Sequence, residues 1–287
     1  MKRIVALPFL LLLLAACRAP LSELITSEAG RSGDDHRSID YRVYLPPGYG
    51  SEPERRYPLL VWFHGGGENE NGWGREGKIG EIVHQRTRRG EIEPFIVLAP
   101  SAGAFTPMWF GYEKRLVGET IPHIETRYRT NGVRVAFGHS MGGLSLLMVH
   151  LRNPMLFDAV CLASPFLFDT SAWDSPERRA WYEKKFDGAG FSSEYRKNQR
   201  KYFDNEEQLR HWDPYSLLRA HNPAPAAPLL LTCGDRDPLG LWPHTMHLRE
   251  VMTECGLRPE WLPQEGVGHG TVEDTRLMDW LSAASRR

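Results

Sequence analysis

The chain has 287 residues, of which 35 are lysine or arginine and 36 are aspartate or glutamate, so its formal net charge is −1. This balance excludes the strongly basic surface that nucleic-acid-binding proteins present to phosphates, and no long basic run is present. The length suits one large α/β domain that buries a full hydrophobic core.

The N-terminus has the build of a secretory signal. Two basic residues precede an apolar run at residues 4–16, which is shorter than the roughly 20 residues that a membrane-spanning helix needs. The run ends in Leu-Ala-Ala-Cys, which resembles the lipobox of bacterial lipoproteins and implies lipidation of Cys17. A plain signal peptide followed by a coincidental cysteine is the alternative.

This resemblance implies three segments: a signal peptide at residues 1–16, a lipidated tether at 17–37 and a soluble domain at 38–287. A thiol that carries two or more acyl chains is a stable membrane anchor. We therefore expect the protein in the bacterial cell envelope, bound to a membrane through Cys17 and facing the periplasm or the cell exterior.

Short apolar runs recur along the remaining chain and predict a mostly parallel sheet. Each run is continuous, which is typical of strands that are buried on both faces. The first predicted strand covers Arg42 to Leu45. The others cover residues 59–63, 95–99, 133–137, 159–163 and 229–233.

Helical patterns separate these runs, so we expect a doubly wound α/β sheet. Pro122 is expected to kink the first helix, Asn153-Pro154 to end the second, and Pro243 and Gly256 to bound the third. The predicted helices include residues 117–128, 144–151, 243–255 and 277–281.

Residues 165–222 interrupt this alternation, because they are rich in aromatic and charged side chains and contain no clear strand. They are expected to form a helical insertion that covers one end of the sheet. Both a partial lid and simply packed helices fit the pattern.

Ser140 lies in the pattern Gly-x-Ser-x-Gly, between a predicted strand and a predicted helix. This setting is the one that a nucleophile elbow requires, whereas the pattern alone also fits a structural turn. Gly138 and Gly142 leave room for the sharp backbone turn. Ser140 is therefore the candidate nucleophile, and it needs a base to take its proton.

An acid and a histidine follow Ser140 in the expected order. The strand at residues 229–233 leads into Asp235 and Asp237 at the same sheet edge as the elbow. We favour Asp237 as the triad acid, because an early Asp such as Asp235 often bonds the backbone of its own turn. His269 lies in a glycine-rich loop before the last helix and is the candidate base.

Three other histidines compete for the role of base: His221, His244 and His247. The last two lie on a predicted helix and need no special loop. Their position makes them weaker candidates than His269.

The strand at residues 59–63 ends in His-Gly-Gly-Gly, a loop that resembles the oxyanion loop of lipases and esterases. The backbone N–H groups of Gly66 and Met141 are the candidate oxyanion donors, and His64 is assigned a structural role. No Gly-Lys-Ser/Thr follows the loop, which excludes a phosphate-binding P-loop.

Taken together, these residues resemble the α/β-hydrolase superfamily, and more narrowly the esterase family that includes esterase D, feruloyl, acetyl-xylan and enterochelin esterases and mycolyltransferases. The matching stretches are residues 41–49, Tyr57-Pro58 with the glycine loop, 119–125 and 138–143. The resemblance implies an α/β-hydrolase fold for residues 38–287 as the catalytic domain. It is least specific at the acid loop, since some enterochelin esterases manage with a Ser–His pair.

The resemblance implies a serine esterase that acts through an acyl-enzyme on small acyl, acetyl or feruloyl-type esters, including saccharide-linked ones. An acyltransferase, a peptidase or a lipid-anchored, non-catalytic binding module are the alternatives. No metal or organic cofactor is implied. Trp73 and Trp109 are possible substrate-lining residues, although core packing explains each equally well. Cys161 and Cys233 are expected to be buried free thiols.

Overall fold

The computed structural model describes residues 27–75, 79–186, 191–220, 227–270 and 275–286. The predicted signal peptide at 1–16, its lipidation site Cys17 and the candidate base His221 lie outside the described residues.

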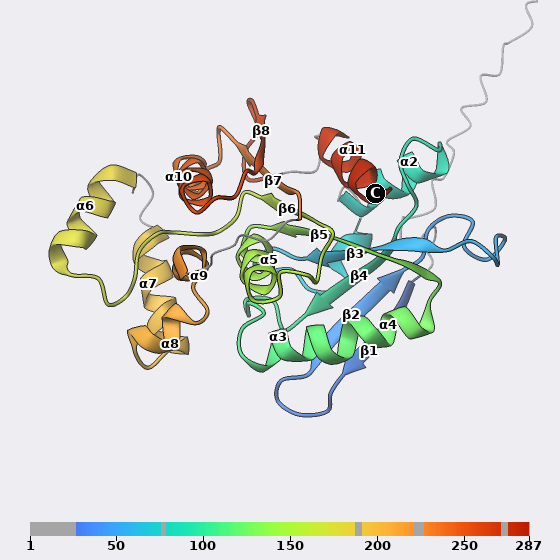
Figure 1. Ribbon diagram of the computed structural model, residues 1–287, viewed down its shortest axis with the longest axis horizontal. Helices are drawn as coiled ribbons and strands as arrows, with labels where there is room; N and C mark the ends of the chain where they lie inside the picture. The colour runs from blue at the N-terminus through green and yellow to red at the C-terminus, as the bar shows by residue number, and fades with distance from the viewer. Residues whose placement is uncertain (1–26, 76–78, 187–190, 221–226, 271–274, 287) are drawn as a thin grey trace, which may run out of the picture.

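One eight-stranded sheet runs through the molecule in the order β1-β2-β4-β3-β5-β6-β7-β8 (Figure 1). β1 pairs with β2, and β2 with β4, in antiparallel fashion, and all later neighbours are parallel. The strands are β1 (Ser27–Ser32), β2 (Ile39–Tyr44), β3 (Tyr57–Phe63), β4 (Ile96–Ser101), β5 (Thr130–His139), β6 (Ala159–Ala163), β7 (Leu229–Gly234) and β8 (Glu260–Gln264). The mostly parallel sheet predicted from the sequence is therefore confirmed.

β1 falls inside the segment predicted as a tether, residues 17–37. Its residues Ser27–Ser32 are polar and only partly buried, so no apolar pattern marks the strand. Backbone pairing with β2 holds it, together with an ion pair between Arg31 and Asp40. The sheet thus begins at Ser27, ahead of the boundary expected at residue 38.

Helices cover both faces of the sheet. They are α2 (Ile79–Arg88), α3 (Gly111–Arg115), α4 (Ile121–Arg127), α5 (Met141–Arg152), α6 (Pro176–Phe186), α7 (Phe191–Tyr202), α8 (Glu206–Arg210), α9 (Pro214–Ala220), α10 (Leu241–Glu254) and α11 (Thr275–Ala284), with a short 3₁₀-helix η1 (Gly72–Gly74) and a π-helix η2 (Leu116–Thr120). Among the described residues, none of these helices is long and apolar enough to cross a bilayer.

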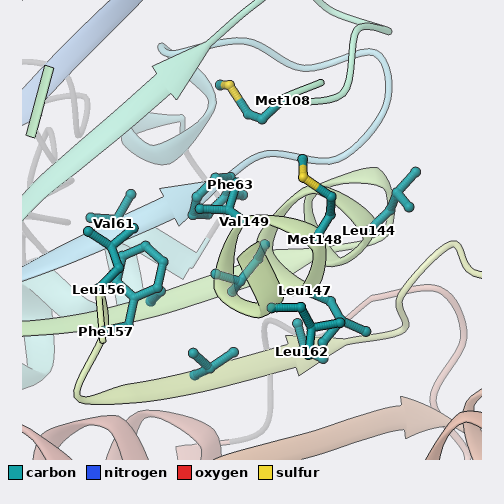
Figure 2. Close-up of a cluster of buried hydrophobic side chains, with 14 of the residues drawn as sticks. Val61, Phe63, Met108, Leu144, Leu147, Met148, Val149, Leu156, Phe157 and Leu162 are labelled. Atoms are coloured by element: carbon teal, nitrogen blue, oxygen red, sulfur yellow. The ribbon is translucent and has the colours of Figure 1, made fainter. Parts of the chain in front are cut away.

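The strand side chains alternate between two hydrophobic cores. On β3, Val61 and Phe63 face the core beneath α5, whereas Trp62 faces the core under α2 and α11. Figure 2 shows the first core, where Leu147 and neighbouring side chains of α5 pack onto the central strands. Side chains on both faces of the central strands are thus buried.

Pro122 is accommodated by a change of hydrogen-bond register. α3, η2 and α4 follow one another without a break, and the segment between residues 116 and 120 is a π-helix in which the N–H of Ile121 bonds the carbonyl of Leu116. Proline lacks an N–H, so the wider turn just before it relieves the mismatch. The predicted kink is thus realised as a π segment.

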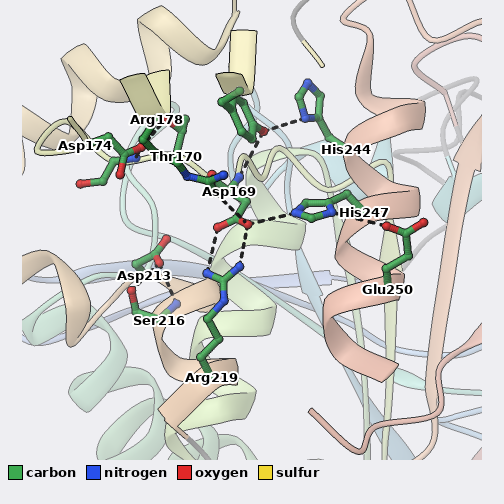
Figure 3. A network of polar contacts seen from close by, with 12 residues as sticks. Asp169, Thr170, Asp174, Arg178, Asp213, Ser216, Arg219, His244, His247 and Glu250 are labelled. Atoms are coloured by element: carbon green, nitrogen blue, oxygen red, sulfur yellow. Dashed lines mark hydrogen bonds and ion pairs between the residues drawn. The ribbon is translucent and has the colours of Figure 1, made fainter. Parts of the chain in front are cut away.

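The described part of residues 165–222 contains α6 to α9, as predicted for a helical insertion (Figure 1). Asp169 ties the insertion to α10 (Figure 3). Its carboxylate accepts two hydrogen bonds from Arg219, at 2.9 and 2.6 Å, and lies 3.0 Å from Nε2 of His247. Arg178 of α6 adds a longer contact at 3.4 Å.

Burial alone would raise the pKa of Asp169, but the hydrogen bonds from His247 and Arg219 and the nearby guanidinium charges hold it well below its ordinary value. Next to this cluster, Nδ1 of His244 lies 2.8 Å from the hydroxyl of Tyr182. Both competing histidines on α10 thus hold the insertion in place. These contacts pack the described helices of the insertion against α10, and a partial lid and packed helices both stay open as predictions.

Candidate active site

Ser140 occupies a sharp turn between β5 and α5. Its backbone has φ 55° and ψ −117°, a combination that residues other than glycine rarely adopt. β5 ends at His139 and α5 begins at Met141, so Ser140 alone makes the turn. Strain of this kind is typical of functional positions, and here it supports the elbow geometry that the sequence pattern predicts.

Gly138 and Gly142 make the turn possible. A Cβ on Gly138 would lie 2.4 Å from the carbonyl oxygen of Gly142, and a Cβ on Gly142 would lie 2.0 Å from that of Phe63. Both obstacles are backbone atoms, which cannot move aside as a flexible side chain can. The pattern around Ser140 therefore requires glycine at both positions.

A chain of hydrogen bonds joins three side chains that are far apart in the sequence. Oγ of Ser140 lies 2.9 Å from Nε2 of His269, and Nδ1 of His269 lies 2.7 Å from Oδ2 of Asp237. With the carboxylate ionised, Nδ1 donates to Asp237 and Nε2 accepts from the serine hydroxyl. The structure thus brings together the three residues that the sequence singles out, in the order that activates a serine.

Asp237 is held rigidly. Its side chain has no exposure to solvent, against 21 % for the side chain of His269. Oδ1 of Asp237 accepts a hydrogen bond from the N–H of Leu239 at 2.8 Å, which leaves Oδ2 for the histidine.

Asp235, the alternative acid, has a different partner. Its Oδ1 accepts a hydrogen bond from the N–H of Gly266 at 2.7 Å, so it fixes the loop that carries His269. Gly234 lets that loop come close, because a Cβ there would lie 2.2 Å from the carbonyl oxygen of Val267. Asp235 and Gly234 therefore position the histidine loop, while Asp237 contacts the histidine itself.

The glycine loop after β3 is shaped by His64. Its Nδ1 lies 2.9 Å from the carbonyl oxygen of Gly65, and its Nε2 lies 3.0 Å from Oγ of Ser101 at the end of β4. The pKa of His64 lies below its ordinary value, mainly because the ring is buried, while the bond to Gly65 acts in the opposite direction. A neutral His64 thus acts as a structural clamp for the loop, as expected.

The loop lies beside the nucleophile. A Cβ on Gly65 would be 3.6 Å from Cβ of Ser140, and Gly66 next to it is exposed. Met141 is the first residue of α5, where N–H groups have no partner within the helix. The two candidate oxyanion donors thus come from two segments next to Ser140: Gly66 from the loop after β3, and Met141 from the start of α5.

A cleft of about 270 Å³ opens beside Ser140. Its apolar lining residues are Trp62, Ile79 and Phe137, and Glu68 is the acidic residue among those that line it. The remaining lining residues are Gly65, Gly66, Gly72, His139, Ser140, His269 and Gly270. The volume lies just below the range of roughly 300–1,000 Å³ that is typical of ligand pockets, so the cleft suits a short chain or a single ring.

Trp73 and Trp109 are not among the described residues that line this cleft. Trp73 is only 2 % exposed, and its ring packs edge-on against Trp62, one layer behind the wall. Trp109 is 6 % exposed and packs against Tyr202 and Phe203. Both are therefore core residues. The sequence could not decide between core and pocket, because both kinds of site have apolar neighbours.

Sequence reasoning does not identify His139 and Glu68. The ring of His139 packs against that of His269, with centroids 4.8 Å apart, and both rings line the cleft. The only signals in the sequence are their places, one beside the nucleophile and the other just after the glycine loop.

The described cysteines lie outside the cleft beside Ser140. Cys161 and Cys233 are free and buried, as predicted, and burial raises the pKa of Cys233 to about 11. Cys255 is also free. Across the described ranges, no group of three or more His, Cys, Asp or Glu side chains is placed to hold a metal ion.

A family model described as "Putative esterase" matches residues 32–269. An endo-1,4-beta-xylanase/feruloyl esterase from Xylanibacter ruminicola is 39% identical over 131 residues, which cover 40% of this chain and 18% of that protein. Endo-1,4-beta-xylanase Y from Acetivibrio thermocellus is 32% identical over 154 residues, covering 48% of this chain and 14% of the relative. The chain thus spans less than a fifth of the length of these curated relatives.

Solved structures show the same fold over most of the chain. A ferulic acid esterase matches with a TM-score of 0.63 and 22% identity, covering 91% of this chain and 97% of that one. An S-formylglutathione hydrolase from Agrobacterium tumefaciens matches with a TM-score of 0.63 and 16% identity, covering 92% and 95%. The fold is therefore the α/β-hydrolase fold, as the sequence resemblance implies.

Proposed function

Because the chain belongs to the putative esterase family, we propose that it is a serine carboxylic-ester hydrolase that works through an acyl-enzyme. The observation that carries this proposal is the hydrogen-bonded chain from Asp237 through His269 to Ser140. The strained elbow and the cleft beside it supply a nucleophile and a place for the ester.

In the acylation half, Oγ of Ser140 attacks the ester carbonyl carbon while Nε2 of His269 takes the hydroxyl proton. Negative charge moves to the carbonyl oxygen, where the N–H groups of Gly66 and Met141 donate hydrogen bonds to it. The C–O bond to the alcohol then breaks, and His269 returns the proton to the leaving oxygen. Asp237 keeps the imidazole in the correct tautomer and stabilises its transient positive charge.

In the deacylation half, water takes the place of the alcohol. His269 accepts a proton from the water as its oxygen attacks the acyl carbon, and the same backbone donors stabilise the second oxyanion. The intermediate then collapses, His269 returns the proton to Oγ of Ser140, and the carboxylic acid is released. Protons and charge balance over the cycle without any group beyond these residues and water.

We place the acyl group in the cleft lined by Trp62, Ile79 and Phe137. Its volume of about 270 Å³ favours acetyl and other short acyl groups or a single aromatic ring. The carboxylate of Glu68 would accept a hydrogen bond from a hydroxyl on such a ring. The names of the similar xylanase/feruloyl esterase and ferulic acid esterase support feruloyl-type esters as the aromatic candidates.

The test is hydrolysis of p-nitrophenyl acetate and butyrate by the protein, by Ser140→Ala and by His269→Ala. We expect a burst of p-nitrophenol close to one per enzyme molecule, then steady turnover, and loss of both phases in either variant. His123→Ala, at an exposed histidine of α4, is the control for removing a histidine. If the parent and Ser140→Ala both ran at the background rate, ester hydrolysis would be rejected in favour of ligand binding or transfer to a demanding acceptor.

We also propose that the protein is lipid-anchored at Cys17 in the cell envelope. The lipobox-like ending of the apolar run supports this location. Expression in a bacterial host, followed by membrane fractionation, should place the parent with membranes and Cys17→Ser in the soluble fraction or retained as the unprocessed precursor. Equal fractionation of both would reject the anchor and leave the catalytic proposal untouched.

A further inference from the structure

A second pocket, of about 210 Å³, lies on the helical insertion and is formed by α6, α7 and the segment that follows β6 (Figure 1). The described residues that line it are Ala172, Arg179, Ser193, Arg196, Lys197 and Arg200. None of them is among the described residues that line the cleft beside Ser140. Four of the six carry a positive charge and none is acidic, so we call this site the arginine pocket.

Only part of the positive charge in the arginine pocket is compensated. Arg196 and Lys197 have carboxylate partners on α6 and α7. Arg179 and Arg200, in contrast, contact no carboxylate within the described part of the chain, and their hydrogen bonds go to the backbone. Two positive charges in the pocket are therefore left without a counter-charge.

The two uncompensated guanidinium groups meet at one backbone oxygen. Nη2 of Arg179 donates to the carbonyl of Ala172 at 2.7 Å, and Nη2 of Arg200 donates to the same oxygen at 2.6 Å. The N–H of Ala172 donates to the buried side chain of Gln199 at 2.7 Å. The guanidinium of Arg200 also lies over the ring of Trp173, 5.0 Å from its centroid. The fold thus holds two like charges next to each other, although they repel.

Most hydrogen-bond donors of this arginine pair are available to a ligand. A guanidinium has five N–H donors, and among the described residues Arg179 and Arg200 each use one. Nε of Arg179 is buried and has no hydrogen-bond partner in the described ranges, which is an unfavourable state for a donor. Ser193 adds a hydroxyl from the first turn of α7, where the helix dipole favours negative charge.

These features indicate an anion with several oxygen atoms. A guanidinium binds such a group through two parallel N–H···O bonds, which gives it a preference over a simple halide. Two uncompensated charges are matched better by a doubly charged phosphate or sulfate group than by a single carboxylate. The volume lies below that of pockets that enclose a whole organic ligand, so it admits one such group and leaves the rest of a larger molecule outside.

We propose that the arginine pocket binds a tetrahedral dianion, a phosphate or sulfate group, between Arg179 and Arg200. Oxygen atoms of this group accept hydrogen bonds from both guanidinium groups and from the hydroxyl of Ser193. Arg196 and Lys197 add longer-range attraction. The bound anion neutralises the two like charges and connects α6 and α7 to the segment after β6. It takes no part in ester hydrolysis, and this binding site stands whether or not the protein is an esterase.

The test is calorimetric titration of the protein with inorganic phosphate, inorganic sulfate, glucose 6-phosphate and acetate, with the ionic strength held constant by chloride. At about pH 8 the phosphate groups carry close to two charges. We expect saturable binding of the dianions with a dissociation constant on the order of 1 mM, and acetate binding about 10-fold weaker. Tighter binding of glucose 6-phosphate than of inorganic phosphate would identify a group carried on a larger molecule, and the reverse order would identify the free ion.

Arg179→Gln and Arg200→Gln should each weaken phosphate binding about 10-fold, because each removes a charge-assisted donor set. Arg179→Lys keeps the charge but loses the planar fork, so its affinity should fall between those of the parent and Arg179→Gln. Lys184→Gln is the matched control, since it removes an exposed charge from α6 at a residue that is not among those described as lining the pocket. Circular dichroism checks that each variant is folded.

Three results would overturn the site. The first is the absence of saturable phosphate and sulfate binding up to about 20 mM, well above the expected dissociation constant. The second is equal affinity in the parent, Arg179→Gln and Arg200→Gln. The third is an equal loss in Lys184→Gln, which would mean that the anions respond only to the net charge of the helix.

Discussion

The two oxygens of Asp237 have separate partners, and this division sets the orientation of His269. Oδ1 is occupied by the backbone of Leu239, so only Oδ2 is left for Nδ1 of the histidine. With that contact in place, Nε2 faces Ser140 as an acceptor. An amide in place of the carboxylate would turn an N–H toward Nδ1 or favour the wrong tautomer.

We therefore expect Asp237→Asn to lower kcat by about 10⁴, by analogy with known triads, with little change in KM. Asp235→Asn is the matched control, because it changes the same group two residues away. Its bond to Gly266 lies outside the hydrogen-bonded chain to Ser140, so it should cost much less than Asp237→Asn. Steady-state kinetics on p-nitrophenyl acetate measure both. A larger loss in Asp235→Asn would reverse the assignment of the acid.

Among the elements, the insertion depends on one carboxylate. Asp169 comes shortly after β6, and its side chain is only 8% exposed. Arg219 of α9, His247 of α10 and Arg178 of α6 all point to it, as Figure 3 shows. Side chains from three helices thus bind one carboxylate in the segment that follows β6.

Asp169→Asn should destabilise the protein by about 2–3 kcal/mol, because it removes the buried carboxylate charge to which Arg219 and His247 donate hydrogen bonds. Arg219 is 49% exposed and regains water, which keeps the loss from being larger. Urea unfolding measures the free energy, and limited proteolysis shows whether residues 165–222 are cleaved first. Glu206→Gln breaks an exposed ion pair with Arg210 and should cost less than about 0.5 kcal/mol. Equal free energies of unfolding for the two variants would contradict the fastening role of Asp169.

The elements found from the sequence are those with a strong apolar pattern. β3, β6 and β7 are buried along their whole length, so continuous apolar runs reveal them. β1 is polar, and β8 at the opposite edge is mostly half-buried, so neither has such a run. An edge strand is held by backbone hydrogen bonds to its neighbour. Its own side chains therefore need no apolar pattern, and its sequence does not reveal it.

At the scale of the whole molecule, the predicted order of Ser140, Asp237 and His269 works because parallel strands end at one edge. The sequence places each residue after a strand or before a helix, and the fold then brings them within hydrogen-bond distance. The cleft, with His139 and Glu68 among its lining residues, could not be predicted from the sequence. It depends on which loops from different strands contact one another, and residue spacing along the chain does not predict those contacts.

Global stability should depend on one buried histidine with no catalytic role in the proposed mechanism. His150 of α5 has no exposed surface, and neither ring nitrogen has a hydrogen-bond partner within the described part of the chain. Burial lowers the pKa of His150 to about 4 from an ordinary value of 6.5. Between pH 6.5 and about pH 4, His150 is protonated in the unfolded chain but neutral in the folded protein. The free energy of unfolding must therefore fall as the solution is acidified.

The loss attributable to His150 should begin near pH 6.5 and reach about 3 kcal/mol near pH 4, since each unit of pKa difference is worth about 1.4 kcal/mol. His150→Leu removes the titrating ring and fills the site with an apolar side chain, so its stability should fall less over this range. Urea unfolding at steps from pH 4 to 8 gives both curves, and His123→Leu at an exposed position controls for the loss of a histidine. Parallel curves for the parent and His150→Leu would mean that the folded protein admits a proton or water at this site. The dense packing of α5 against the central strands argues against such access, because a charged imidazolium there would have to break the same core that holds Ser140 at its turn.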